Sequence, residues 1–430
     1  MSACKIVIVG GGAGGLELAT KLGRYYRNKD DASVLLLDKH AFHIWKPLLH
    51  EVASGSMNAE TEGLDYRQHA ANNGFEFQMG CLNDIDRDNK QLKLDAINDV
   101  SGEVLVPERT ISYNICVLAL GSVTNDFGVP GVKQHSYSLD DTQQAARFHK
   151  RVFNQFIRLK ALGADKPLRI AVVGAGATGV ELTAELYQLA ESLKMYGFKN
   201  VDRSSLQVQL IEAGPRVLAA LPERISDRAS EILKKLGTEL HLSTRVNEIC
   251  ENGLKINDGE FLEADLLVWC AGVKCRDFLK DIGGLETNRA NQVVVNDFLQ
   301  SSIDSDIFAL GDCAALTQAD GSQVPPRAQS AHQMASQVYK NIKLRLSDRP
   351  EQKFEYKDHG SLVSFANYSS VGVLRGLVRE RVFVEGSIAK RLYVSLYRLH
   401  QVALHGYFRT GLLMLVSKLS KKLRPVLKLH

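Results

Sequence analysis

A glycine-rich loop at the start of the chain restricts the possible folds more than any other feature. Residues 5–9 (KIVIV) are a continuous apolar run, typical of a strand buried on both faces of a parallel sheet. Residues 16–22 have the pattern of an amphipathic helix, and a second apolar run, 33–37, ends in Asp38. Between the first strand and the helix lie three glycines at the GxGxxG spacing, Gly10, Gly12 and Gly15. This order predicts a Rossmann-like unit that binds a dinucleotide.

Each part of this motif has a physical role in holding a dinucleotide. Gly10 allows the tight turn, Gly12 lets backbone amides approach a pyrophosphate, and Gly15 lets the helix pack close to the strand. The helix N-terminus faces the phosphates with its partial positive charge. Asp38 is placed to accept hydrogen bonds from a ribose diol.

The same pattern returns in the middle of the chain. Residues 169–173 (RIAVV) lead into a second GxGxxG, a helix is expected over 180–193, and a strand at 208–211 ends in Glu212. The second set of glycines is Gly174, Gly176 and Gly179. A carboxylate at this strand end accepts from a free 2′-hydroxyl and repels a 2′-phosphate, so a preference for NADH over NADPH is expected. Arg216, four residues on, is the one feature that argues the other way.

Three further strand ends carry small or acidic residues. The segment 305–314 (SDIFALGDCA) predicts a strand before Asp312, whose carboxylate is either at the ribityl chain of a flavin or part of an ordinary acidic turn. A helix is expected to begin at Ala328. Two other apolar runs end in small residues that let backbone approach a ligand, namely Ala119 and Gly121 in one, Ala271 and Gly272 in the other.

Composition excludes several other classes of protein. The chain is 45% apolar and 24% charged, and 53 Lys and Arg against 49 Asp and Glu leave a net charge of +4, too little to indicate nucleic-acid binding. The seven cysteines are scattered, without CxxC pairs or zinc spacing, so neither a disulfide scaffold nor a metal site is expected. The N-terminus has no secretory signal pattern, and no uncharged apolar run reaches the roughly 18 residues of a spanning helix.

The C-terminal segment concentrates positive charge. Residues 386–430 contain no Asp or Glu and nine cations: Lys390, Arg391, Arg398, Arg409, Lys418, Lys421, Lys422, Arg424 and Lys428. Apolar residues recur there at helical spacing, in one stripe before Gly406 and another after Gly411. The first stripe is Leu392, Leu396, Leu399 and Ala403, beside Tyr393, Tyr397, His400 and Leu404; the second is Leu412, Val416, Leu419 and Leu423. Such leucines are usually core, but the unbroken basic charge favours two amphipathic helices lying on an anionic membrane.

Taken together, the motifs resemble the two-dinucleotide-binding-domain flavoproteins, and within them the bacterial type II NADH:quinone oxidoreductases, or alternative NADH dehydrogenases. The resemblance covers essentially the whole chain. Its most specific segments are 46–55 (KPLLHEVASG), 176–186 (GATGVELTAEL), the LGDCA motif and 325–333 (PPRAQSAHQ). The last is similar to the family's AQxAxQ quinone-site signature, as Ala328, Gln329, Ala331 and Gln333.

This resemblance implies a non-covalent FAD in the first unit, NADH on the second, and hydride transfer from nicotinamide C4 to flavin N5. It implies that a quinone, ubiquinone or menaquinone, then takes two electrons. The residues implied for FAD are Gly10, Gly12, Ala13, Gly14, Gly15, Asp38, Lys39, Lys46, Leu82, Ala119, Gly121, Asp312, Ala328 and Gln329. Those implied for NADH are Gly174, Gly176, Thr178, Gly179, Glu181, Glu212, Ala271 and Gly272.

Four residues are expected to take part in catalysis. Gln329 and Gln333, at i and i+4 on one helix face, would line the quinone pocket, although glutamines on a polar helix face are the plainer interpretation of the spacing alone. Glu181, on the first turn of the second dinucleotide helix, either orients the nicotinamide or relays a proton, or else only stabilises the helix. His359 stands where many relatives carry a lysine, so a titratable charge would replace a fixed one.

Three alternatives stay open on this scaffold. A disulfide oxidoreductase needs a CxxxxC pair beside the flavin, and the segment after Asp38 has no cysteine, whereas Cys270 and Cys275 have that spacing in the second unit. A sulfide:quinone reductase would need cysteines at the flavin and no nicotinamide site. A non-enzymatic NADH sensor would share both cofactor sites but would need no quinone signature.

The sequence therefore predicts an α/β fold with two Rossmann-like dinucleotide-binding domains, the second inserted in the first, and a C-terminal membrane-associating region. The expected FAD domain is 1–118 with 294–350, the NADH domain 119–293, and the C-terminal region 351–430. The expected function is FAD-dependent NADH:quinone oxidoreduction in a respiratory chain without proton pumping. A peripheral position on the cytoplasmic face of the bacterial inner membrane and a homodimer are also expected, with no nucleic-acid partner.

Overall fold

The computed structural model describes residues 3–99, 101–162, 166–198, 201–257, 259–375 and 381–423. By its internal contacts the chain forms two compact units. Unit 1 comprises Met1–Trp45, Gly63–Val123 and Val273–Lys357, and unit 2 comprises Lys46–Glu62, Thr124–Gly272 and Asp358–His430. Contacts alone do not assign a role to either unit, so the three-part division expected from the sequence stays a prediction.

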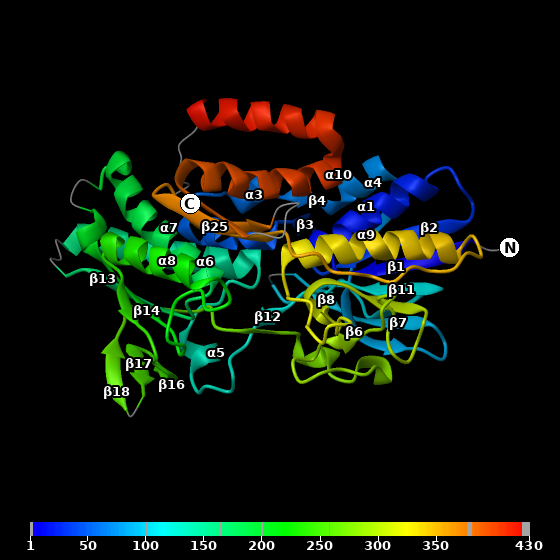
Figure 1. Ribbon diagram of the computed structural model, residues 1–430, viewed down its shortest axis with the longest axis horizontal. Helices are drawn as coiled ribbons and strands as arrows, with labels where there is room; N and C mark the ends of the chain where they lie inside the picture. The colour runs from blue at the N-terminus through cyan, green and yellow to red at the C-terminus, as the bar shows by residue number, and fades with distance from the viewer. Residues whose placement is uncertain are drawn as a thin grey trace. The chain divides into compact units, whose positions relative to one another are not determined.

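Unit 1 is built on a parallel sheet of five strands in the order β22-β11-β1-β2-β5, of which Figure 1 labels β11, β1 and β2. Their bounds are β1 Cys4–Val9, β2 Ala32–Asp38, β5 Glu76–Met79, β11 Ile115–Leu118 and β22 Ile307–Ala309. The central strand β1 pairs in parallel with β2 and β11 and is buried from Ile6 to Val9, as its continuous apolar run predicted. The right-handed crossover expected between parallel strands is supplied by helix α1, Ala13–Tyr26.

Helix α9, Ala328–Arg345, packs against α1 in the same unit. At the contact, a Cβ on Gly14 would lie 3.0 Å from the carbonyl oxygen of Ala331, so a glycine is needed there. The remaining elements of unit 1 are short. They are β3 Phe42–His43, β4 Leu64–Asp65, α4 Tyr66–Asn73, β6 Cys81–Asp86, β7 Gln91–Asp95, β8 Ile97–Asn98, β9 Val104–Val106, β10 Arg109–Ser112, β20 Val273–Lys274, β21 Val293–Val294 and β23 Ala314–Ala315.

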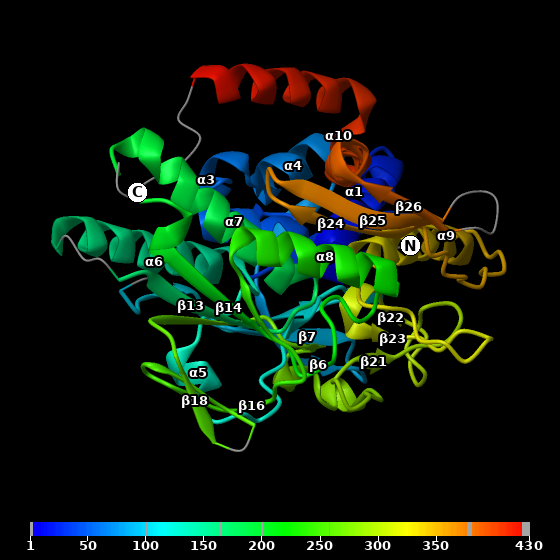
Figure 2. The same cartoon turned by 60° about the vertical axis from the view of Figure 1, so that its left-hand side comes forward.

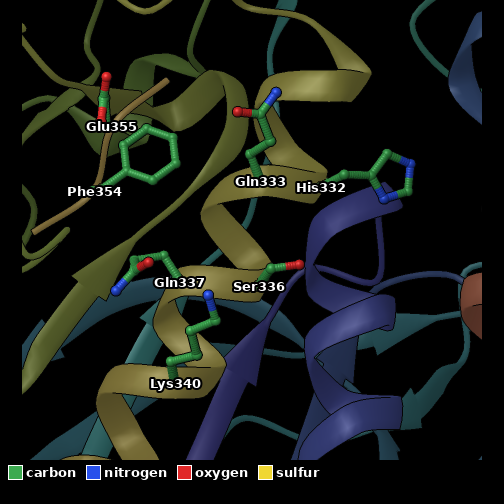
Figure 3. Close-up of a pocket in the computed structure, with 7 residues that line it drawn as sticks. All are labelled: His332, Gln333, Ser336, Gln337, Lys340, Phe354 and Glu355. Carbon is green, nitrogen blue, oxygen red and sulfur yellow. The ribbon is translucent and has the colours of Figure 1, made fainter. Parts of the chain in front are cut away.

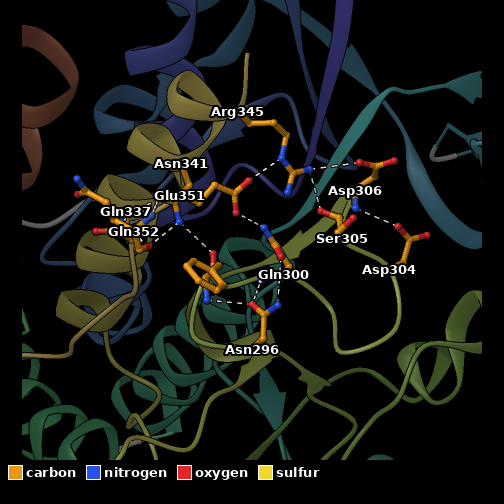
Figure 4. Close-up of polar contacts among 11 residues, drawn as sticks. Asn296, Gln300, Asp304, Ser305, Asp306, Gln337, Asn341, Arg345, Glu351 and Gln352 are labelled. Atoms are coloured by element: carbon orange, nitrogen blue, oxygen red, sulfur yellow. Dashed lines mark hydrogen bonds and ion pairs between the residues drawn. The ribbon is translucent and has the colours of Figure 1, made fainter. Parts of the chain in front are cut away.

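A polar network fixes the C-terminal end of α9 (Figure 4). The Arg345 guanidinium donates to Glu351 at 2.6 Å, to the Ser305 carbonyl at 2.8 Å and to Asp306 at 3.2 Å. Asn341 donates to the Gln352 carbonyl at 2.9 Å and accepts from the Gln352 amide at 2.9 Å. Because Asp306 directly precedes β22, the network ties α9 to the edge strand of the unit 1 sheet.

Unit 2 contains a second parallel sheet in the order β15-β14-β13-β19. The strands are β13 Leu168–Val173, β14 Leu206–Ile211, β15 Glu239–His241 and β19 Leu266–Trp269. Helices α7, Ala177–Leu193, and α8, Glu223–Leu236, pack against strands of this sheet. A separate antiparallel sheet consists of β16 Val246–Cys250, β17 Gly253–Ile256 and β18 Glu260–Glu263. The other helices before the C-terminal segment are α2 Leu49–Ser54, α3 Ala59–Glu62, α5 Val132–His135 and α6 Thr142–Leu162.

The C-terminal part of unit 2 has strands β24 Gly360–Phe365, β25 Ser369–Arg375 and β26 Arg381–Glu385, followed by α10, Gly386–Leu423. Gly406 has a non-helical backbone (φ 77°, ψ 171°) and divides α10 into two helical segments, which Figure 2 shows in orange and red. The break at Gly406 confirms the expected pair of helices. Gly411, by contrast, lies inside the second segment.

The expected stripes on these helices are only partly right. In the first segment His400 and Leu404 are each 2% exposed, while Leu399 is 62% exposed. The buried face of this helix is therefore the one that carries Tyr393, His400 and Leu404, and not the one that carries Leu399. In the second segment the five consecutive apolar residues 412–416 are all exposed, on every side of the helix rather than along one stripe. The cations Arg424 and Lys428 lie outside the described residues. No helix in the described ranges is long and apolar enough to span a membrane.

Candidate functional site: two carboxyl edges

The predicted ligand residues of unit 1 follow four neighbouring strands. Along the carboxyl edge of the sheet, Asp312 follows β22, Ala119 follows β11, Gly10 follows β1, and Asp38 ends β2. The chain leaves β1 toward β2 through α1, whereas β11 lies on the other side of β1, so the topology reverses between β1 and β11. A crevice at such a switch point is where open α/β sheets bind their ligands.

The glycines of the first loop are required by the protein itself. Gly10 has φ +106°, and a Cβ there would lie 2.4 Å from the Ala119 carbonyl oxygen. A Cβ on Gly15 would lie 1.9 Å from the Gly10 carbonyl oxygen. At Gly12, by contrast, the nearest atom to a Cβ would be 4.0 Å away, which leaves the first turn of α1 open to a ligand. This arrangement fits a pyrophosphate at the helix N-terminus.

Asp38 is held in place by two backbone amides. Its carboxylate accepts from Gly11 N at 2.7 Å and from His40 N at 2.8 Å. A carboxylate has about four acceptor positions, so two remain for a ribose diol. On the other side of the edge, Ser122 donates to Asp312 at 2.7 Å. The Asp312 carbonyl accepts from the amide of Gln292 at 2.8 Å and from the thiol of Cys275 at 3.5 Å, two supports that the sequence did not reveal.

The second edge repeats this geometry. Gly174 has φ +100° and lies against Ala271, and a Cβ on Gly179 would lie 2.0 Å from the Gly174 carbonyl oxygen. Glu212 accepts from Ala175 N at 2.8 Å and from Gly214 N at 2.8 Å, as Asp38 does from its own loop. Arg216 donates to the carbonyls of Leu221 and Ala219 at 2.8 and 2.7 Å. Its guanidinium therefore braces its own loop, which weakens the argument for a 2′-phosphate.

Glu181 lies in a buried cluster of polar side chains in unit 2. The carboxyl is 7% exposed, and burial raises the pKa of Glu181 to about 8, although it accepts from the Ser364 amide at 3.0 Å. Burial also lowers the pKa of His50 to about 4. At neutral pH both groups are uncharged, so the 3.6 Å approach of His50 Nδ1 to Glu181 Oε2 is not an ion pair. Glu181 holds a proton that it can release.

One turn further along α7 lies a second buried carboxyl, Glu185, which no sequence motif marks. Glu185 accepts from the hydroxyls of Ser54 and Ser56 at 2.9 and 3.0 Å, and burial raises its pKa despite these bonds. Burial and the neighbouring Glu181 raise the pKa of Tyr393 as well. No local pattern predicts this cluster, because its members come from three distant segments. Only the i, i+4 spacing of Glu181 and Glu185 was visible in the sequence.

The two glutamines of α9 stand in different surroundings. Gln333 donates to the Lys357 carbonyl at 2.8 Å and accepts from the Lys357 amide at 2.9 Å, so its amide holds the segment after α9. It also lines an open pocket of about 300 Å³ (Figure 3), whose residues are His332, Gln333, Ser336, Gln337, Lys340, Phe354 and Glu355. Gln329 does not line it. Six of the seven side chains are polar, so the pocket does not suit an apolar quinone ring.

His332 points from α9 toward α1 in Figure 3, away from Gln333. Its Nδ1 contacts the carboxylate of Glu17, which also accepts from Lys21 at 2.6 Å. Burial would raise the pKa of Glu17, but the contacts with His332 and Lys21 outweigh it and lower the pKa. Lys21 donates onward to Ser336 at 2.8 Å. This network, in which only Glu17 is buried, connects α1 to α9.

The other predicted residues lie as follows. Ala13 and Gly14 open α1, Lys39 follows β2, Leu82 is buried in β6, Gly121 follows β11, and Ala328 opens α9, all in unit 1. Lys46, Thr178, Ala271, Gly272 and His359 belong to unit 2, where His359 is exposed just before β24. Cys270 is half-buried in unit 2, whereas Cys275 is buried in unit 1. No disulfide joins any of the seven cysteines.

Comparison with known proteins identifies the class and then the family. Residues 4–335 match the family described as pyridine nucleotide-disulphide oxidoreductase. The chain is 45% identical over 99% of its length to the type II NADH:quinone oxidoreductase of Haemophilus influenzae, 99% of which is covered. The enzyme of that name from Staphylococcus saprophyticus is 29% identical over 86% of this chain and 90% of its own.

Among solved structures, NDH2 of Plasmodium falciparum in complex with NADH matches 99% of both chains with a TM-score of 0.79 at 19% identity. The sulfide:quinone oxidoreductase of Aquifex aeolicus matches 98% of this chain and 96% of its own, with a TM-score of 0.73 at 17% identity. These two likenesses show the shared fold. The sequence matches show that the chain belongs to the type II NADH:quinone oxidoreductases.

Proposed function

We propose that this protein oxidises NADH with a non-covalent FAD and passes the two electrons to a membrane quinone, ubiquinone or menaquinone. The balanced reaction is NADH + H⁺ + quinone to NAD⁺ + quinol. The observation that carries the proposal is the presence of two complete dinucleotide edges in one chain, each with its own glycine loop and terminal carboxylate. Family membership adds the quinone as the acceptor.

The FAD site of this proposal lies on unit 1. Its pyrophosphate would meet the amides at Gly12 to Gly15, its adenosine ribose would meet Asp38, and its ribityl chain would meet Asp312. When bound there, FAD supplies a two-electron acceptor for the hydride of NADH and a donor for the quinone. Residues 1–118 and 294–350 are proposed to form the FAD domain and residues 119–293 the NADH domain, although residues 46–62 belong to unit 2 and residues 119–123 and 273–293 to unit 1.

The NADH site of this proposal lies on unit 2. The amides at Gly176 and Thr178 would bind the pyrophosphate at the N-terminus of α7, and Glu212 would accept from the adenosine ribose. Glu181 would supply or take up a proton. Its pKa of about 8 keeps it protonated at neutral pH but close enough to that pH to release the proton. Gln329, Gln333 and His359 are proposed on the quinone side; Gln333, whose amide is bonded to Lys357 through one N–H and its oxygen, would offer its second N–H to a quinone oxygen.

The second segment of α10 is proposed as the membrane contact. Leu412, Leu413, Met414, Leu415 and Val416 are 40–56% exposed, and Tyr407 and Phe408 are 84% and 87% exposed. An exposed apolar run of this size is typical of a surface that contacts a membrane or another protein. The cations of the segment favour an anionic bilayer, where the quinone also resides. We place the enzyme on the cytoplasmic face of the bacterial inner membrane, in a respiratory chain, with the same helices also pairing two subunits.

Glu212→Gln is expected to narrow the preference for NADH over NADPH by roughly ten-fold in kcat/KM, because it removes the charge that repels a 2′-phosphate. The measurement is kcat/KM with each nucleotide at fixed quinone. Since the amide can accept only one of the two bonds from Ala175 and Gly214, the melting temperature is recorded alongside. Glu248→Gln, on strand β16, removes the same charge from a side chain that is 42% exposed and serves as a control. An unchanged ratio would remove Glu212 from the nucleotide site.

A chain ending at Gly406 is expected to leave the membrane fraction, with at least about a ten-fold drop in vesicle-bound protein. This end point retains the buried residues His400 and Leu404 and removes the exposed apolar run 412–416, together with the buried Thr410. Sedimentation with anionic vesicles measures the bound fraction. The matched variant Leu412→Gln with Leu415→Gln retains every cation, so its release would assign the binding to apolar contact. Full retention of the shortened chain would place the anchor elsewhere.

The proposed function is tested by steady-state assay of the purified yellow protein. NADH oxidation is followed with and without a short-chain quinone, and flavin is extracted by heat to show that it is non-covalent. The expected result is a rate that depends on quinone concentration and saturates. NADH consumption that is equally fast without quinone would point to oxygen or another acceptor, and no consumption at all would favour a sensor.

A further inference from the structure

An exposed aromatic residue in unit 2 has a strained backbone. Phe127 has φ +49°, in the left-handed region that bulky residues avoid, yet its side chain is 62% exposed. Two other large residues with positive φ, Leu218 and Leu299, are 3% and 0% exposed, so core packing compensates their strain. Phe127 lacks that compensation and is held instead in a tight turn, which the Val129 amide closes by donating to the Asp126 carbonyl at 2.9 Å. Strained conformations that packing does not explain cluster at ligand sites.

The ring of Phe127 rests on the strand end that follows β19. A Cβ on Gly272 would lie 2.4 Å from Cζ and 2.7 Å from Cε2 of Phe127. The space left by the missing side chain of Gly272 is therefore filled by the phenyl ring. One side of the ring contacts the backbone at Gly272, while most of the ring surface is exposed to solvent.

The loop that carries Phe127 is fastened to the same strand end. The Asn125 side chain accepts from the Phe127 amide at 3.0 Å, and the Asn125 carbonyl accepts from the Trp269 indole at 2.8 Å. The Asn125 amide donates to the Gly272 carbonyl at 3.4 Å. With its backbone pinned on both sides, the ring is preorganised and loses little freedom when something packs on it.

The order of strands places this ring at a definite point along a bound dinucleotide. Glu212 follows β14, the loop from Gly174 follows β13, and Gly272 follows β19, and these strands are neighbours in that order. Since Glu212 suits the adenosine ribose and the Gly174 loop suits the pyrophosphate, the next position along the edge belongs to the nicotinamide half. Gly174 and Ala271 are in direct contact, so the ring stands beside the pyrophosphate loop.

We propose that Phe127 contacts the nicotinamide nucleotide of NADH, as a preformed apolar surface that positions the ring for reaction. This inference rests on the proposed NADH site and adds to it a residue that no glycine motif or acid marks. An aromatic contact of this kind contributes about ten-fold in affinity. The strained backbone is then the cost of presenting the ring at this position.

The test uses three variants of the full-length FAD-loaded enzyme. Phe127→Gly and Phe127→Asn remove the ring but accept positive φ, so neither should lower the melting temperature, and Phe127→Tyr keeps the ring. The expected result for Phe127→Gly and Phe127→Asn is a roughly ten-fold higher KM for NADH and Kd for NAD⁺, with FAD content and quinone KM unchanged. Phe127→Tyr should stay within about two-fold of the wild type. Phe261→Gly, which removes a half-exposed phenyl ring from β18, is the matched control.

The possible outcomes separate this proposal from the proposed function. If NADH does not reduce the wild-type flavin, the NADH site itself is wrong and this proposal falls with it. If NADH reduces the wild type and the ring-free variants retain its KM and Kd, only the role of Phe127 is overturned. If the ring-free variants lost melting temperature and FAD content along with NADH affinity, Phe127 would have a structural role instead. A similar rise of the KM for NADH in Phe261→Gly would lead to the same conclusion.

Discussion

Gly15→Val is expected to give a protein that does not retain FAD. A Cβ at this position lies 1.9 Å from the carbonyl oxygen of Gly10, so α1 must move away from β1 before the side chain fits. Overpacking against backbone costs about 3 kcal/mol or more, which corresponds to at least roughly a hundred-fold loss of FAD affinity if it is taken from binding. The measurement is the ratio of flavin absorbance to protein absorbance after gel filtration.

Gly179→Val makes the same change at the second edge, where a Cβ lies 2.0 Å from the Gly174 carbonyl oxygen. This variant is expected to stay yellow and to lose reduction by NADH, because the altered loop belongs to unit 2. Gly176→Ala tests the ligand itself, since its Cβ would meet no described atom within 4 Å and only a pyrophosphate could clash. Its melting temperature should be normal while its NADH affinity falls.

The neutral control for these substitutions is Gly411→Ala, which sits in a helix with no described atom within 4 Å of the added Cβ. The contrast between Gly15→Val and Gly179→Val is decisive. If Gly179→Val lost FAD while Gly15→Val kept it, the assignment of the two dinucleotides to the two units would be reversed. If both variants kept both ligands, neither loop would be a nucleotide site.

Glu181→Gln is expected to make the protein less sensitive to alkaline pH and to slow turnover. Burial raises the pKa of Glu181 to about 8 in the folded state, against an ordinary value near 4.5 in the unfolded chain. The folded protein therefore keeps a proton that the unfolded chain releases between these two pH values. The stabilising contribution is complete below about pH 4.5 and is lost as the pH rises through 8.

The loss amounts to roughly 1.4 kcal/mol per pH unit within that window. Glutamine cannot ionise, so between pH 6 and pH 8 the variant should gain on the order of 2 kcal/mol relative to the wild type, seen as a change of a few degrees in the difference of melting temperatures. Glu231→Gln, exposed on α8, should track the wild type. A constant difference between Glu181→Gln and wild type across this range would contradict a raised pKa.

The kinetic part of the prediction separates positioning from proton transfer. Loss of a general acid typically costs 10²- to 10⁴-fold in rate, and the loss should appear in the proton-dependent step. The pH profile of kcat should lose its inflection near 8 in Glu181→Gln. A variant that is slow but keeps this inflection would assign the transferred proton to another group. Glu185 is the next candidate in the same buried cluster.

The parallel sheets and both glycine loops could be predicted from the sequence because their signals are local. The apolar runs 5–9 and 169–173 became the buried strands β1 and β13, and the expected helix from Ala328 is α9. The acids Asp38 and Glu212 stand at the strand ends where the spacing placed them. Such elements depend mainly on periodicity and turn chemistry within about 30 residues, so a local pattern can indicate them.

The features that were missed depend on distant contacts or on backbone angles. Glu185 meets Ser54 across 131 residues, and Ser364 donates to Glu181 across 183, so no local pattern indicates these buried bonds. The positive φ of Phe127 has no marker in a residue type that normally avoids it. The prediction of which stripe of α10 is buried was wrong, because helical periodicity shows which residues share a face but not which face packs against another element.

This protein is proposed to take electrons from NADH at one edge and to give them to a quinone. The most direct measurement is sequential anaerobic stopped-flow, in which NADH and then a short-chain quinone are mixed with the protein while flavin absorbance is followed. The predicted result is rapid bleaching by NADH and rapid recovery of the oxidised spectrum with quinone. Bleaching without recovery would contradict the quinone assignment while keeping both nucleotide sites, and no bleaching would contradict the account as a whole.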